Sequence, residues 1–118
     1  MDKTLFIFKR LKDVLVAIEE IEFYLSERPK RFDVFCKDRM FRSAVLYNIS
    51  VIGEAIGRIL KDDPSIKITS ARQIVNTRNY VIHGYDSLDN EILWGIVINH
   101  LPTLKDEVQE LLASADGQ

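Results

Sequence analysis

Apolar residues recur at intervals of three and four along almost the whole chain, and this period restricts the fold more than any other feature. The first stripe consists of Leu11, Val14, Leu15, Ile18, Ile21 and Leu25. The second consists of Phe41, Ala44, Val45, Ile49, Ile52, Ile56 and Ile59. Such spacing marks one face of an α-helix, and no stretch alternates at period two for long enough to predict a strand. The sequence therefore predicts an all-α protein.

Proline and turn residues divide the first half of the chain. The first helix is expected over residues 3–26, because Pro29 cannot extend it. Residues 28–38 form a connection, with a short helical turn that tucks Phe32 and Phe35 inward.

The next helix is expected over residues 38–60, before a polar turn. Gly53 and Gly57 lie four positions apart within it, and such glycines in a helix most simply indicate the close approach of another helix. Thr69 or Ser70 can cap the following helix.

That following helix ends on His83, and Gly84 is a plausible left-handed stop. Asp89 is a good N-cap for the last helical segment, which Pro102 either kinks or divides in two. The prediction is one domain over residues 1–118, an up-and-down bundle of four to five helices with short connections.

Composition narrows the location of the protein. The 118 residues contain one cysteine, Cys36, which cannot form an internal disulfide. The N-terminus has no uncharged apolar core typical of a signal peptide, and the uninterrupted apolar runs are far shorter than the roughly 20 residues of a membrane span. We expect a cytoplasmic protein with no membrane association.

The formal net charge of −2 is spread unevenly. The first 50 residues hold ten Lys or Arg against eight acids, and residues 51–118 hold six against ten. The basic residues of the window 28–42 are Arg28, Lys30, Arg31, Lys37, Arg39 and Arg42. This window is either a phosphate-attracting patch or a solvated helix connection, and the sequence favours neither. The acidic half offers surface for a different partner.

Only two histidines are present, and they lie in unlike surroundings. His100 lies next to Leu101 on an apolar stripe and is interpreted as a partly buried structural imidazole. His83 follows Arg78 and Asn79 at a helix end and precedes Tyr85. No cysteine or histidine cluster has zinc spacing, and we expect neither a metal nor a cofactor.

The spacing of Arg78 and His83 has a geometric consequence. Five helical residues rotate by roughly 500°, so the two positions point about 140° apart on an unbroken helix. Either the helix breaks near Gly84 or a second chain supplies a second copy of the motif across a two-fold axis.

Arginine and histidine together suit a phosphodiester. The guanidinium group matches phosphate oxygens and stays charged, and the imidazole titrates near neutral pH and can move the proton of an attacking 2′-hydroxyl or a leaving 5′-oxygen. This pair could cleave RNA without a metal ion, although a capped helix end with two surface side chains remains an alternative.

The segment Arg78-Asn79-x-x-x-His83-Gly84-Tyr85 resembles the R-x-x-x-x-H-x-Y motif of HepT-type toxins, which belong to the HEPN superfamily of helical ribonucleases. The segments Ile52-Gly53-Glu54-Ala55, Leu93-Trp94-Gly95-Ile96-Val97 and Leu101-Pro102-Thr103-Leu104 also resemble family signatures, in the same order. One departure lies before the third helix, where many members have Pro-Trp and this chain has Lys67-Ile68-Thr69-Ser70.

The resemblance implies a homodimeric helical endoribonuclease that acts as the toxin of a toxin–antitoxin system. It implies an MNT-type nucleotidyltransferase antitoxin as partner, in a possible hetero-oligomer, that transfers AMP to Tyr85. Arg78 and His83 are then the catalytic residues and RNA the substrate. The other reading is a non-catalytic helical module that complements a minimal nucleotidyltransferase.

Two further residues are candidates for supporting roles. Asn79 can hold Arg78 or the helix end. Glu54 is a polar residue in an apolar stretch, and it either orients Arg78 or faces solvent.

Overall fold

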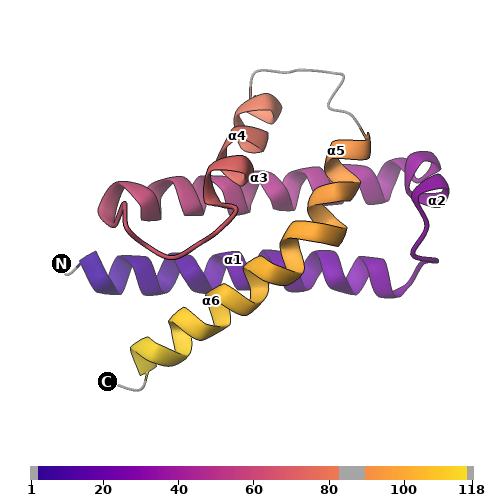
Figure 1. The fold of residues 1–118 in the computed structure, drawn as a ribbon. Helices are drawn as coiled ribbons and strands as arrows, with labels where there is room; N and C mark the ends of the chain where they lie inside the picture. Colours follow the sequence, from indigo (N-terminus) through magenta and orange to yellow (C-terminus); the bar gives the residue numbers. More distant parts are fainter. Residues whose placement is uncertain (1–2, 83–89, 117–118) are drawn as a thin grey trace.

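The computed structural model describes residues 3–82 and 90–116, and every regular element within these ranges is helical (Figure 1). The elements are α1 (Lys3–Ser26), α2 (Phe32–Lys37), α3 (Arg39–Asp62), α4 (Ala71–Ile82), α5 (Asn90–Gly95), the π-helical turn η1 (Ile96–His100) and α6 (Leu101–Asp116). The prediction of an all-α bundle is confirmed for this part of the chain.

The long helices α1 and α3 form the centre of the bundle. They lie side by side and run in opposite directions, and α2 joins them at one end (Figure 1). Helix α4 packs on α3, and α6 crosses α1. The bounds of α1 are those expected from the sequence, and α3 begins one residue after the expected start because Asp38 is its N-cap.

Branched aliphatic side chains make up most of the core. The fully buried ones are Val14 and Ile18 of α1, Val45, Ile49, Ile52, Ile56 and Ile59 of α3, and Leu104 and Val108 of α6. The positions of α1 and α3 fall on the two stripes that the sequence predicts, so the helical period and the buried faces agree.

Helix α3 is long and apolar enough to cross a membrane by length and composition alone, and no other helix in the described ranges meets that test. Its isoleucine stripe is buried against neighbouring helices, and Glu54 and Arg58 lie exposed on its surface. This is the pattern of a central helix in a bundle.

Helix α2 and the adjoining ends of α1 and α3 form a corner of the bundle, which packs around one aromatic side chain. Phe35 is buried, and its ring lies 5.5 Å from that of Phe41 and 5.1 Å from that of Trp94. Phe32 is 37% exposed, and its ring lies 6.4 Å from that of Trp94. The expected inward turn is therefore confirmed for Phe35, whereas Phe32 turns toward Trp94 but is only partly covered.

The connection between α3 and α4 is hydrogen-bonded to α6, the last helix of the chain. The Thr69 hydroxyl donates to the Glu107 carboxylate at 2.6 Å, and the Thr69 N–H reaches the same group at 3.1 Å. Ser70 is the N-cap residue of α4, since its carbonyl accepts the Ile74 N–H. Its hydroxyl lies 3.2 Å from His100 Nδ1. The segment that lacks Pro-Trp is thus held by hydrogen bonds to η1 and α6.

Pro102 lies in the first turn of α6, a helix that begins at Leu101, so of the two expectations for this residue the division of the segment agrees with the structure. Proline has no N–H to donate, so the usual bond from residue 102 to the Ile98 carbonyl cannot form. The chain passes through the π-helical turn η1 instead, and the Leu101 N–H bonds to the Ile96 carbonyl five residues back. Such turns occur often at functional sites.

Candidate functional site

The motif residues lie at the end of α4. The helix contains Arg78 and Asn79 and ends at Ile82, whereas His83 and Tyr85 lie outside the described residues. Their roles stay predictions, as does the capping role of Asp89 and the stop at Gly84.

The residues of α4 that precede the motif divide into a buried and an exposed set. Ala71, Ile74 and Thr77 are buried, and Arg72 is exposed. The Thr77 hydroxyl donates to the Gln73 carbonyl at 3.0 Å.

Glu54 is on the neighbouring helix and is exposed. Its carboxylate pairs with Arg58 one turn later at 3.3 Å, and the two side chains are 51% and 56% exposed. These contacts fit the solvent-facing alternative for Glu54. No contact with Arg78 is described, so that orienting role stays a proposal.

His100 has the surroundings of a structural residue. It lies half-buried in η1, and its Nδ1 atom faces the Ser70 hydroxyl at the start of α4. The interaction links η1 to α4 and supports the structural interpretation of this imidazole.

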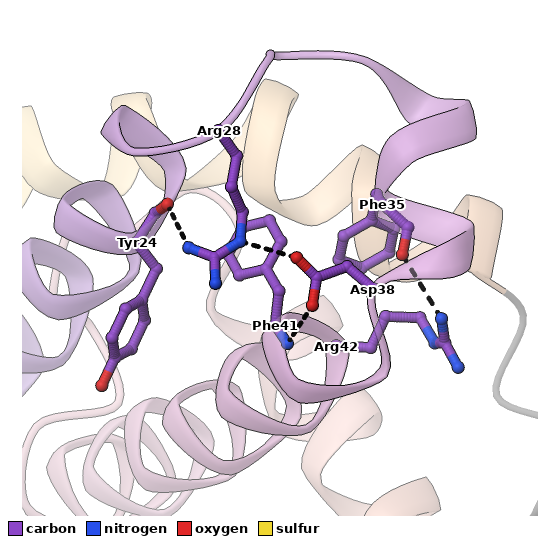
Figure 2. A network of polar contacts seen from close by, with 6 residues as sticks. All are labelled: Tyr24, Arg28, Phe35, Asp38, Phe41 and Arg42. Atoms are coloured by element: carbon purple, nitrogen blue, oxygen red, sulfur yellow. Dashed lines mark hydrogen bonds and ion pairs between the residues drawn. The ribbon is translucent and has the colours of Figure 1, made fainter.

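The basic window around α2 uses much of its charge within the chain (Figure 2). The Arg28 Nε donates to Asp38 at 2.7 Å, its Nη1 donates to the Tyr24 carbonyl at 2.8 Å, and the guanidinium group lies 4.8 Å from the centre of the Phe41 ring. Arg42 donates to the carbonyls of Phe35 and Cys36.

Asp38 is the acceptor at the centre of this corner, and it also caps α3 by accepting the Phe41 N–H at 3.0 Å. The Arg28 hydrogen bond, and then the Phe41 N–H, hold the pKa of Asp38 below its ordinary value. Arg31 is paired with Asp33 at 2.8 Å. The contacts support the second reading of the window, a solvated helix connection, for these three arginines.

A different basic surface lies between α3 and α4. A groove of about 550 Å³ is lined there by Gly53, Glu54, Gly57, Arg58, Leu60, Lys61, Pro64, Arg72 and Val75. A Cβ atom built on Gly57 would lie 3.9 Å from the Val75 side chain, which is ordinary contact. The expected neighbouring helix is present at Gly57, but it does not come close enough to require glycine.

Sequence reasoning missed this groove. Lys61 lies in the last turn of α3 and Arg72 in the first turn of α4, and the residues between them separate the two cations in the sequence. No local pattern in the sequence signals that these two cations lie in one groove.

Within residues 3–82 and 90–116 no three His, Cys, Asp or Glu side chains gather in a way that would hold a metal ion. A second hollow of about 510 Å³ lies between α1 and α3 and includes Arg10, Val16, Tyr47 and Arg58. Glu54 and Arg58 line both hollows.

Comparison with known proteins gives one consistent result. The family described as "Ribonuclease HepT-like" matches residues 14–111. The chain is 31% identical over 113 residues to "Putative RNase MJ0127" of Methanocaldococcus jannaschii, covering 92% of this chain and 88% of the relative. It is 32% identical over 105 residues to "Probable ribonuclease HepT" of Thermococcus cleftensis, covering 86% and 91%. No solved structure matches the chain.

Proposed function

Since this chain belongs to the HepT-like ribonuclease family, we propose that it is a metal-independent endoribonuclease whose site is built on Arg78 and His83. The observation that carries the proposal is the spacing of these residues across the end of α4, within the region that the family matches. RNA is then the substrate.

The proposed reaction is an internal transesterification. His83 removes the proton of a 2′-hydroxyl, the 2′-oxygen bonds to the adjacent phosphorus, and the bond from phosphorus to the 5′-oxygen breaks. The leaving 5′-oxygen takes a proton from a second acid, and the product carries a 2′,3′-cyclic phosphate. Arg78 binds the phosphate oxygens as negative charge builds on them.

The second acid comes from a second copy of the chain in this proposal. A two-fold axis would place each motif opposite its own copy, and one His83 would serve as base while the other serves as acid. The spacing in the sequence supports this arrangement, because Arg78 and His83 would point about 140° apart on an unbroken helix. Val16 and Tyr47, which are 62% and 66% exposed beside the α1–α3 hollow, offer apolar surface for an interface.

We also propose that the protein is the toxin of a toxin–antitoxin pair and that AMP transfer to Tyr85 silences it. An attached AMP adds bulk and a phosphate charge two residues from His83, where the RNA phosphate would bind. The antitoxin expected from the family resemblance is an MNT-type nucleotidyltransferase. Asn79 and Glu54 have supporting roles in this scheme, Asn79 at the helix end and Glu54 toward Arg78.

The test of the ribonuclease is cleavage of single-stranded RNA by the purified, unmodified protein in EDTA. We expect 2′,3′-cyclic phosphate ends, and a loss of roughly 10² to 10⁴ in rate for His83→Ala. The matched control is His100→Ala, which removes the imidazole that contacts Ser70 and should retain activity wherever it folds. Equal rates for the wild type and His83→Ala would refute the assignment, and no cleavage by any form would favour the binding-module interpretation.

The switch is tested by intact mass. Incubation with the nucleotidyltransferase and ATP should raise the mass by whole AMP units and abolish cleavage. A mass increase that persists in Tyr85→Phe would place the acceptor on another residue.

A further inference from the structure

The groove between α3 and α4 carries basic residues that the proposed reaction does not use. Arg58, Lys61 and Arg72 line it, and Glu54 is its one acidic lining residue. Glu54 is already paired with Arg58 at 3.3 Å. Lys61 and Arg72 have no ion-pair partner within the described part of the chain. The groove therefore presents a net positive charge in the more acidic half of the sequence.

Two acidic residues, Asp62 and Asp63, directly follow Lys61 in the sequence. Neither is among the lining residues of the groove, and the Asp63 carboxylate accepts the Ser65 N–H at 3.2 Å and the Ser65 hydroxyl at 2.8 Å in the turn after α3. The lining itself therefore contains three cations and one carboxylate.

One glycine leaves room in the groove. Gly53 and Gly57 both line its α3 side, but Gly53 is buried. A Cβ at Gly57 would meet only the Val75 side chain within 4 Å, at 3.9 Å. The space beside Gly57 is thus open to a ligand, with the cations around it.

The groove also includes part of the helix that contains Arg78. Arg72 lies in the first turn of α4, and the ten residues from it to Ile82, the last residue of that helix, span about 15 Å. A strand held at Arg72 would reach the motif end of α4 within a few nucleotides.

We propose that this groove binds the phosphate backbone of the RNA strand beside the scissile bond, with Lys61 and Arg72 as the principal phosphate contacts and Arg58 as a third. The inference rests on the proposed ribonuclease activity and adds a substrate subsite to it. Arginine presents a planar fork that matches phosphate oxygens, and lysine adds a compact positive charge. The cations outnumber the groove's one carboxylate, which favours a polyanion over a protein surface of mixed charge.

The first test changes only charge inside the groove. Gly57→Glu and Gly57→Gln place side chains of equal size in the same space, and both replace glycine in a helix with a better helix former. In a His83→Ala background, which prevents cleavage, we expect Gly57→Glu to bind a fluorescent single-stranded RNA about fourfold more weakly than Gly57→Gln at 0.15 M salt. Equal affinities of these two variants would overturn the proposal.

The second test counts phosphate contacts. Removing Lys61 and Arg72 together should reduce the slope of log affinity against log salt by about 1.4 and weaken binding roughly tenfold at 0.15 M salt, because each single-strand contact contributes about 0.7. The matched control is the double change Lys30→Ala and Lys37→Ala, which removes the same charge from exposed positions at α2. An unchanged slope, or the same change in the control, would overturn the proposal.

These outcomes are separate from those of the ribonuclease test. If the wild type cleaves RNA in EDTA while the groove variants keep the wild-type slope, the subsite is wrong and the proposed function stands. If the groove variants lose RNA affinity but no form cleaves RNA, the proposed function fails while the binding surface stands. Loss of antitoxin binding with unchanged RNA affinity would assign the groove to a protein partner and overturn the subsite.

Discussion

Two basic regions of this protein differ in what their charges do. At the α2 corner, Arg28 and Arg42 bind carbonyls and a carboxylate of their own chain (Figure 2). In the α3–α4 groove, Lys61 and Arg72 have no such partner among the described residues. A high density of lysine and arginine in the sequence therefore does not by itself locate a ligand site. In our proposal the phosphate-binding surface is the groove, where Lys61 and Arg72 have no acceptor in the described part of the chain.

The largest expected effect on stability concerns the aromatic centre of the corner. Phe35→Ala should lower the free energy of unfolding by about 3–5 kcal/mol, because the side chain is fully buried between Phe41 and Trp94. Urea unfolding measures the change. The control is Phe32→Ala, at a half-exposed ring, with an expected loss of about 1 kcal/mol. Equal losses would mean that the corner is not organised around Phe35.

The second effect concerns the cap of α3. Asp38→Ala removes the acceptor of both the Phe41 N–H and Arg28 and should lower Tm by about 5 °C. Asp38→Asn keeps a good capping side chain and should lose less. If the two variants melt at the same temperature, the cap contributes nothing beyond the ion pair.

The same carboxyl predicts a pH dependence. The pKa of Asp38 is lowered in the folded state from an ordinary value of 3.8. Its contribution to stability is then complete above that value and is lost as the pH falls through the folded pKa. The Tm difference between the wild type and Asp38→Asn should shrink below about pH 4. A difference that grows on acidification would contradict the pairing with Arg28.

The smallest stability effect is expected in the groove. Arg72→Ala should change the free energy of unfolding by no more than about 0.5 kcal/mol, because this exposed side chain has no described partner. Arg28→Ala should destabilise the fold clearly, since it removes the hydrogen bonds to Asp38 and Tyr24. Thermal melts of the two variants measure the contrast directly. A larger loss for Arg72→Ala would mean that the groove cations support the fold.

The sequence predicted the helices better than it predicted their contacts. The apolar stripes predicted α1 and most of α3, because a helix that buries one face has apolar residues at every third or fourth position. The sequence did not show that Phe32 would be less covered than Phe35, and the π-helical turn before Pro102 was missed, since both depend on how neighbouring helices meet.

The candidate site was predictable in its chemistry and not in its surroundings. Arg78 lies in α4 as expected, and the residue types alone pointed to a phosphodiester. The groove depends on Lys61 and Arg72 coming together across a turn, which no local pattern records. Residues 28–42 could form a phosphate-attracting patch or a solvated helix connection. Choosing between the two likewise required the positions of the Asp38 carboxylate and of the backbone carbonyls that Arg28 and Arg42 contact.

One measurement tests the central claim most directly: the rate at which the wild type and His83→Ala cleave the same single-stranded RNA in EDTA. The account predicts cleavage by the wild type to 2′,3′-cyclic phosphate ends, and a rate at least about 100-fold lower for the variant. Cleavage at equal rates, or a wild type that cuts only when a divalent metal ion is added, would contradict it.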